Sequence, residues 1–314
     1  MQIAVLDIGT NTTRLLIASA DGCTVTEEQI RISRVTRLGA GVDASGRLAD
    51  DALQREYEVL KRYHELVESA ADRHGPVERA VAVMTSAVRD AANGADFART
   101  VEQDFHFEAH ILSGDEEARL TYLGATDSFN DRSPSLPTLV IDIGGGSTEF
   151  VIGSGDELDF HVSTQAGVVR QADRHISHDP PTDKELLAFS ADVHATLAAA
   201  VPDERRQGIQ RAIAVAGTPT QLAAIAQHLD PYSPDKVHGY KLTAGERDRI
   251  LARVIRLSPA ERQRQIIGLH PDRANVLIPG IVILKEVMEL FNLDGVEVSE
   301  HDILRGAAIH YSRT

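Results

Sequence analysis

Two short stretches of the sequence combine a carboxylate with a turn rich in glycine, serine and threonine. Residues 7–14 read DIGTNTTR and residues 142–149 read DIGGGSTE, and each stretch follows one apolar run and precedes another. A tight turn of this kind exposes successive backbone N–H groups, which form a concave anion site. Asp7 and Asp142 would repel a phosphate directly, but they suit a hydrated Mg²⁺ or Mn²⁺ that bridges to phosphate oxygens. The pattern therefore predicts a metal-assisted phosphate site at each turn.

The turn residues themselves supply the expected phosphate contacts. Glycine allows a bulky ligand to approach the backbone, and short hydroxyl and amide side chains add hydrogen-bond donors. We assign phosphate contacts to Thr10, Asn11, Thr12, Gly144, Gly145, Gly146, Ser147 and Thr148. A plain hairpin with an aspartate turn is the alternative for either copy alone, and the duplication favours phosphate binding. No glycine is followed by lysine, which excludes a P-loop.

Two adjacent glutamates follow in SGDEEARL, residues 113–120. Ser113 and Glu116 fit a capping box at a helix start, which gives Glu116 a structural role. Glu117 has Leu120 and Thr121 as its helical neighbours, so we expect its side chain to point toward the packed side. A carboxylate aimed inward near a phosphate site is a candidate general base for water. A solvated charge in the first helical turn is the alternative.

Two further charged residues complete the candidate site. Glu149, early in a predicted strand, could bind the metal or orient water as a second catalytic carboxylate, or could simply face outward. Arg89 lies just past a predicted strand end, where a guanidinium can grip two phosphate oxygens, and a solvated helix arginine is its alternative. Arg31, Arg34 and Arg37 are spaced by three, so they cannot share one face of a strand. They supply either a basic rim or a solvated loop.

The elements that must position these residues alternate between strands and helices, which indicates an α/β fold. A hairpin is expected at residues 2–19, a strand at 80–84 and a helix at 50–72. Capping-box patterns start further helices at Thr182, Thr243 and Ser258, an apolar helix spans 276–291, and GVEVS is a last strand. Residues 127–138 are turn-rich, contain two prolines and are the expected connection between domains.

The composition limits the classes of function. The 314 residues suffice for two domains, and the formal charge of −15 argues against non-specific binding to nucleic acid or an acidic membrane. No apolar run approaches the roughly 18 residues that a bilayer span needs. One cysteine, Cys23, allows no internal disulfide or cysteine-based zinc cluster, so a cytoplasmic location is expected. The 13 histidines are scattered, and we expect them to be solvated or structural.

Four stretches resemble the exopolyphosphatase/guanosine pentaphosphate phosphohydrolase (Ppx/GppA) family, within the superfamily of actin, the heat-shock ATPases and the sugar kinases. They are DIGTNTTRLLI, TSAVRDA, ILSGDEEARLTYLGA and VIDIGGGSTEFVIG. The resemblance implies two ribonuclease-H-like lobes with an interlobe cleft, residues 1–126 with 303–314 and residues 127–302. It also implies that Glu117, the second glutamate of its motif, is the catalytic base. Thr10 and Thr12 depart from the serines frequent in the family, as does Arg305-Gly306 from its Arg-Glu-Gly.

The resemblance implies an Mg²⁺-dependent exopolyphosphatase that releases terminal orthophosphate from inorganic polyphosphate. Short chains are the expected substrate, because the extra C-terminal helical domain of the long family members has no counterpart here. Hydrolysis of guanosine pentaphosphate is the alternative, and a small-molecule kinase or a nucleotide-gated binding protein is a remoter one. A homodimer is a family-level expectation. Whether a nucleotide binds near Gly217 is left open.

Overall fold

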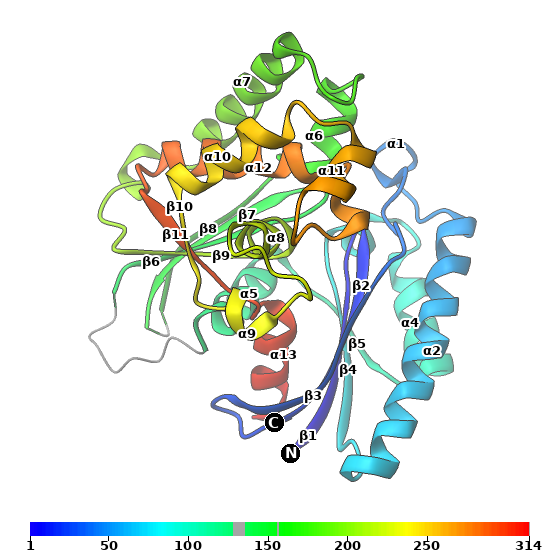
Figure 1. The fold of residues 1–314 in the computed structure, drawn as a ribbon. Coiled ribbons are helices and arrows are strands. Elements are labelled where there is room, and N and C mark those ends of the chain that lie inside the picture. Colours follow the sequence, from blue (N-terminus) through cyan, green and yellow to red (C-terminus); the bar gives the residue numbers. More distant parts are fainter. Residues whose placement is uncertain (128–135, 156, 314) are drawn as a thin grey trace. The chain divides into compact units, whose positions relative to one another are not determined.

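The computed structural model describes residues 1–127, 136–155 and 157–313 (Figure 1). Its internal contacts divide the chain into two compact units. Unit 1 comprises Met1–Ser128 and Asp302–Thr314, and unit 2 comprises Phe129–His301. None of the helices in the described ranges combines the length and the apolar character that a membrane span requires.

Unit 1 is built on a five-stranded sheet with the order β3-β2-β1-β4-β5. Strands β1 and β2 form an antiparallel hairpin that β3 extends, whereas β4 and β5 run parallel to β1. The strands are β1 (Gln2–Ile8), β2 (Thr12–Ala20), β3 (Val25–Val35), β4 (Arg79–Met84) and β5 (Glu108–Ile111). The helices are α1 (Val42–Ser45), α2 (Asp50–His74), α3 (Ser86–Asp90), α4 (Gly94–Phe105), α5 (Gly114–Thr126) and α13 (Ile303–Tyr311).

Helices cover both faces of this sheet, which buries the central strand β1 completely. Leu6 and Ile8 pack in one hydrophobic cluster with residues of α2 and α4, whereas Ile3 and Val5 pack in another with residues of α5 and α13. A strand buried on both faces reads as a continuous apolar run. This explains why Asp7 stands out at the end of β1.

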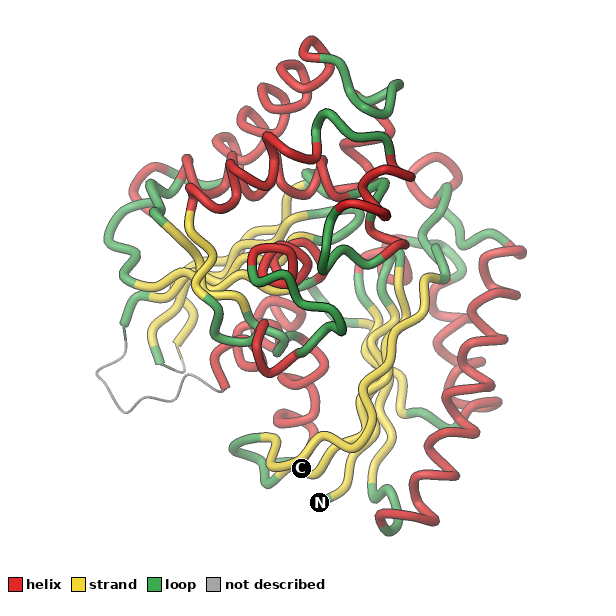
Figure 2. The backbone as a smooth tube through the Cα atoms, viewed as in Figure 1, coloured by secondary structure: helices red, strands yellow, loops and turns green. Residues whose placement is uncertain are grey.

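Unit 2 is built on a six-stranded sheet with the order β10-β11-β9-β6-β7-β8. The strands are β6 (Thr138–Ile143), β7 (Thr148–Ser154), β8 (Glu157–Thr164), β9 (Arg211–Val215), β10 (Lys241–Thr243) and β11 (Gly295–Val298). The longer helices are α6 (Val168–His175), α7 (Asp183–Ala200), α8 (Gly217–Ala226), α10 (Ala244–Val254), α11 (Pro259–Gln265) and α12 (Leu277–Leu290). The shorter ones are α9 (Pro234–Val237), η2 (Asp203–Arg205) and η3 (Pro271–Arg273). Figure 2 shows the strands of both sheets in yellow and the helices in red.

The two sheets repeat one topology. In unit 2 the strands β6, β7, β8, β9 and β11 take the places that β1 to β5 take in unit 1, and β10 is added at the edge. The first two strands of each sheet form the hairpins recognised in the sequence, with Asp7 opposite Arg14 and Asp142 opposite Glu149. The predicted α/β class with two ribonuclease-H-like lobes is confirmed, and the interlobe cleft stays a prediction.

Most expected elements are present, and the structure adds several that the sequence pattern does not predict, β8, α4 and α6 among them. Residues 25–35 form strand β3, so the alternative of a solvated loop is wrong for Arg31 and Arg34. These residues form a strand because they pair with β2. The alternation of apolar and polar residues within 25–35 does not indicate this pairing. Strand β10 is a further element that the sequence pattern does not predict. The capping boxes that begin at Thr182, Thr243 and Ser258 all form. The predicted connection 127–138 lies largely outside the described residues.

Candidate active site

In unit 1 the candidate residues gather at the carboxyl ends of three parallel strands. Ile8 of β1 aligns with Met84 of β4, and Met84 aligns with Ile111 of β5. These strands lead directly into the first turn, into α3 and into α5. Ligands of open α/β sheets bind at this edge. The topology therefore brings Asp7, the first turn, Arg89 and Glu117 to the edge of the sheet formed by the carboxyl ends of these strands.

The first turn directs its backbone carbonyls to one side. The N–H of Gly9 donates to the Thr12 carbonyl at 3.1 Å, which closes the turn. The carbonyls of Thr10 and Asn11 accept N–H groups from residues 36–39, at 2.8–3.1 Å. Among the described residues, no acceptor takes the N–H groups of Thr10 and Asn11. Amides of this kind are suited to bind an anion.

The second turn is built in the same way. The N–H of Gly144 donates to the Ser147 carbonyl at 2.9 Å, and the carbonyls of Gly144 and Gly145 accept N–H groups from residues 168–170. Arg170 Nε donates to the Gly146 carbonyl at 2.9 Å. Within the described part of unit 2, the N–H groups of Gly145 and Gly146 meet no acceptor. Both turns thus commit their carbonyls to the protein and leave amides for a ligand.

Two glycines that the sequence motifs do not single out support these turns. A Cβ at Gly39 would overlap the Thr10 side chain and lie 3.2 Å from the Thr10 carbonyl oxygen. A Cβ at Gly167 would overlap the backbone of Gly146 and Ser147 and lie 2.5 Å from the Gly145 carbonyl oxygen. Gly39 comes shortly after β3 and Gly167 shortly after β8, the strands that extend the two hairpins. The sequence signal for these residues is a glycine at the same structural position in both repeats. It is hard to recognise because the two glycines lie at different sequence distances from Asp7 and Asp142.

The side chains of the turn residues differ in their roles. The Thr10 hydroxyl hydrogen-bonds to that of Ser86 at 3.0 Å, which ties the first turn to α3. Asn11 Nδ2 lies 3.5 Å from the Thr12 hydroxyl. Thr148 is fully buried, and its hydroxyl donates to the Ala166 carbonyl at 2.7 Å. The structure therefore places the Thr148 side chain beneath the second turn.

Asp7 is held by the residue opposite it in the hairpin. Arg14 Nε and Nη2 donate to the same oxygen, Oδ2, at 2.8 and 2.5 Å. Burial raises the pKa of Asp7, and Arg14 partly opposes this effect. Arg14 also pairs with Asp302, the N-cap of α13, to which Arg31 Nη2 comes within 3.1 Å. Burial acts to raise the pKa of Asp302, but Arg14 and Arg31 outweigh it and leave this pKa low.

The second hairpin replaces the arginine by a carboxylate. Asp142 and Glu149 are register partners on β6 and β7, so their side chains share one face. Ser163 donates to Glu149 Oε1 at 2.7 Å. Two carboxylates directly opposite each other repel, and a divalent cation between them offsets that repulsion. No group of three or more metal-ligating side chains occurs among the described residues, so phosphate and water would complete the coordination of Mg²⁺ here.

Glu117 and Arg89 form an ion pair in unit 1. Arg89 Nη1 lies 2.9 Å from Glu117 Oε2 and also donates to the Leu112 carbonyl at 3.0 Å. The Glu117 side chain is 19% exposed and that of Arg89 29%. Burial raises the pKa of Glu117, Arg89 opposes the rise, and Asp7 adds to it. A partly buried carboxylate with a raised pKa has the properties of a general base.

The neighbouring Glu116 differs from Glu117 in its hydrogen bonds, its pKa and its exposure. The Ser113 hydroxyl and N–H donate to Glu116 Oε2 at 2.7 and 2.8 Å, and the predicted capping box is complete. These hydrogen bonds from Ser113 lower the pKa of Glu116. Glu116 is exposed. The structure thus separates an exposed capping glutamate from a partly buried, ion-paired one within two consecutive residues.

Comparison with known proteins gives the family. The model of the Ppx/GppA phosphatase family matches residues 17–307. Exopolyphosphatase 2 of Mycobacterium tuberculosis is 33% identical, with 98% of each chain covered. Guanosine-5′-triphosphate,3′-diphosphate pyrophosphatase of Aliivibrio fischeri is 29% identical over 94% of this chain and 56% of its own length. A crystal structure of the Aquifex aeolicus Ppx/GppA member matches with a TM-score of 0.83 at 29% identity, covering 99% of this chain and 97% of that one. The chain belongs to the Ppx/GppA phosphatase family.

Proposed function

We propose that this protein is a divalent-metal-dependent exopolyphosphatase that releases terminal orthophosphate from inorganic polyphosphate. The relative named exopolyphosphatase 2 matches over the full length of both chains, which supports polyphosphate as substrate. The observation that carries the proposed chemistry is Glu117, partly buried with a raised pKa at the strand edge that also holds Asp7 and the first turn. The amides of the two turns would bind phosphate groups, with Thr10, Asn11, Thr12, Gly145, Gly146 and Ser147 as donors, while the N–H of Gly144 closes the second turn.

The proposed metal ligands are Asp142 and Glu149 in unit 2 and, as a separate candidate, Asp7 in unit 1. The opposed carboxylates of the second hairpin fit Mg²⁺ or Mn²⁺ better than the first hairpin does, because Arg14 already neutralises one oxygen of Asp7. When bound, the cation would neutralise charge on the phosphate oxygens. A net charge of −15 gives the protein a general repulsion for polyanions, which favours short polyphosphate chains over long ones.

In the proposed reaction Glu117 accepts a proton from a water molecule. The water oxygen forms a bond to the terminal phosphorus, and the bond from that phosphorus to its bridging oxygen breaks. The electron pair of this bond stays with the shortened chain, and orthophosphate leaves. Amide donors at the first turn, which lies at the same strand edge as Glu117, stabilise charge on the equatorial oxygens in the transition state.

Arg89 can take either of two roles in this scheme. As a phosphate ligand it would leave Glu117 when substrate binds. As a partner of Glu117, which is its position in the structure, it limits the rise in pKa of the base. The first role predicts that loss of Arg89 raises KM, and the second predicts that it shifts the pH dependence of kcat.

Hydrolysis of guanosine pentaphosphate is the second candidate function, and the relative from Aliivibrio fischeri favours it. Ala216 adds a local observation, because it has φ 70° and ψ −170° immediately before α8. Such a conformation is strained for alanine and occurs mainly where function maintains it. A nucleotide near Gly217 would give this strained turn a role.

A phosphate-release assay distinguishes the candidates. Tripolyphosphate, long-chain polyphosphate, guanosine pentaphosphate and ATP are compared at equal concentrations of terminal phosphate with Mg²⁺ present. We expect the highest kcat/KM with tripolyphosphate. A kcat/KM for guanosine pentaphosphate more than tenfold higher would assign the second function, and release from none of these substrates would refute both.

We also propose a cytoplasmic homodimer. The single cysteine, Cys23, is exposed and agrees with a reducing compartment. The dimer rests on the family resemblance alone.

A further inference from the structure

Glu56 is a buried carboxyl in unit 1 that the proposed reaction does not use. It lies in the second turn of α2, and its side chain is fully buried. Its carboxylate accepts a hydrogen bond from the Thr13 hydroxyl, with distances of 2.7 and 2.8 Å to the two oxygens. The hydroxyl of Thr36 is its second partner. Charged carboxyls are rarely buried without a cation, so this position requires a reason.

Both partners of Glu56 belong to the support of the first turn. Thr13 follows the turn directly and pairs with Ile8 across the hairpin. The N–H of Thr36 donates to the Asn11 carbonyl at 3.1 Å, and this contact helps to direct the turn amides outward. One carboxylate therefore connects the end of the turn with the segment that holds its carbonyls.

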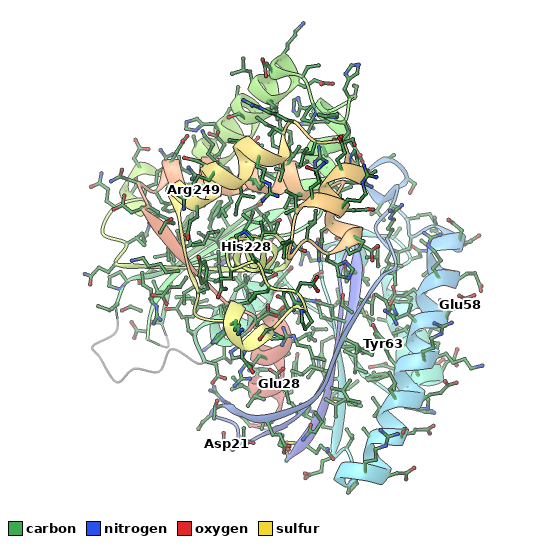
Figure 3. The ribbon with its side chains drawn as sticks, in the orientation of Figure 1. Asp21, Glu28, Glu58, Tyr63, His228 and Arg249 are labelled. Carbon is green, nitrogen blue, oxygen red and sulfur yellow. The ribbon has the colours of Figure 1, made fainter. Side chains whose placement is uncertain are left out.

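Within the part of the chain that the structure describes, no cation compensates the charge of Glu56. No lysine, arginine or histidine of the described residues pairs with it, and Arg55 Nε instead donates to the Thr36 carbonyl at 3.0 Å. Asp7 adds negative potential from β1. Tyr63, which lies on the sheet side of α2 (Figure 3), donates its hydroxyl to the Thr13 carbonyl, and burial raises the pKa of Tyr63 to about 12, so it stays neutral. Arg34 contributes positive potential at Tyr63.

The second hairpin shows that the same support does not need a charge. There the equivalent hydroxyl, that of Thr148, donates to the backbone carbonyl of Ala166, and the Thr164 hydroxyl donates to the Thr148 carbonyl at 2.9 Å. The ionisable group is thus an addition specific to the first hairpin. A titratable carboxyl close to an anion site makes the affinity of that site for an anion depend on pH.

We propose that Glu56 is a positioning residue for the first phosphate turn and that it takes up a proton when a phosphate group binds there. The inference rests on the proposed function of that turn. Burial raises the pKa of Glu56 to about 6 in the free protein. A phosphate anion placed on the turn adds negative potential and raises this pKa further. Binding and protonation then favour each other, as linkage requires.

The sign of the effect follows directly. Below about pH 6 Glu56 is already protonated, and binding requires no further proton. Above that pH the free protein carries a charged Glu56 that opposes the anion, so affinity falls as pH rises. The fall ends above the higher pKa of the bound state. Glu56→Gln keeps the shape and accepts a hydrogen bond but never carries the charge, so it should lack this fall.

The test measures the Kd of tripolyphosphate by titration calorimetry between pH 5 and 8, in buffers of different ionisation enthalpy, for the wild type, Glu56→Gln and Glu56→Ala. Protonation of tripolyphosphate itself affects all proteins equally and cancels in a ratio. The matched control is Glu58→Gln, which removes the same charge from the exposed side of the same helix (Figure 3).

We expect the ratio of wild-type Kd to Glu56→Gln Kd to be near one at pH 5 and to reach about fivefold or more at pH 8, a size typical of coupled sites. Proton uptake should exceed that of Glu56→Gln near pH 6.5, Glu56→Ala should bind weakly at every pH, and Glu58→Gln should behave as wild type. A ratio that does not change with pH, with wild-type binding intact, overturns the role of Glu56 alone. Absence of tripolyphosphate binding by the wild type overturns the proposed function as well.

Discussion

Removal of the Arg89 guanidinium should change the pH dependence of the reaction. Arg89 Nη1 lies 2.9 Å from Glu117 Oε2, and both side chains are less than one third exposed. A charge-assisted hydrogen bond of this kind contributes about 1.5–3 kcal/mol, and partial exposure favours the lower value. Since 1.36 kcal/mol corresponds to about one pKa unit, the pKa of Glu117 should rise by about one unit in Arg89→Ala.

The assay is kcat for tripolyphosphate from pH 5 to 9. A general base must be deprotonated, so activity falls on the acidic side of its pKa, and this limb should move about one unit higher in Arg89→Ala. Arg89→Lys should give a smaller shift because the ammonium keeps the charge. Arg99→Ala, which removes an exposed arginine on α4, is the matched control and should leave the limb unchanged. An unmoved acidic limb in Arg89→Ala, together with a raised KM, would show that Arg89 binds phosphate and does not tune Glu117.

Three further predictions concern the metal, the second turn and the buried carboxyl. A chelator should abolish phosphate release and Mg²⁺ or Mn²⁺ should restore it, while Asp142→Asn should raise the concentration of Mg²⁺ needed for half-maximal activity; full turnover without metal would contradict this. Gly167→Ala should shift the second turn, lower the free energy of unfolding by about 1–3 kcal/mol and raise KM. Gly245→Ala, whose Cβ meets only the end of the Arg249 side chain, should have little effect on KM. Equal melting temperatures and equal kinetics for the two variants would contradict this prediction. The pKa of Glu56 in the folded protein, about 6, exceeds its ordinary value of 4.5. Burial of the charged carboxylate therefore lowers the free energy of unfolding by about 2 kcal/mol above pH 6 and has no effect below pH 4.5. Urea unfolding of Glu56→Gln should therefore show a gain of this size at pH 8 and none at pH 4, and a gain independent of pH would argue against burial as its cause.

The fold can be predicted largely because the signals are local. An aspartate after an apolar strand and before a glycine-rich turn marks a hairpin, and its duplication indicates two lobes of one topology. The capping box at Ser113 likewise depends on residues three apart, so the amino-acid sequence is enough to separate Glu116 from Glu117. Strand β3 is not predicted because the feature that defines it is the register with β2, which is not local.

The support of the turns cannot be predicted for the same reason. Gly39 and Gly167 matter because another backbone lies where a side chain would be, and the sequence does not show that approach. Glu56 reads as one more charge on an amphipathic helix, yet it is buried against Thr13, 43 residues away. The sequence correctly places Arg89 just past a strand end, but its contact with Glu117 needs the parallel alignment of β4 and β5.

The most direct test of Glu117 as the general base compares two adjacent residues. Glu117→Gln and Glu116→Gln are assayed for kcat with tripolyphosphate, with melting curves to show that each variant is folded. If Glu117 accepts the proton from water, Glu117→Gln should lower kcat by about 10²–10⁴ while tripolyphosphate still binds. Glu116→Gln can still form the capping box, so its kcat should stay within a few fold of wild type. A folded Glu117→Gln variant with wild-type kcat would contradict the central claim, and Glu149 would then be the next candidate for the base.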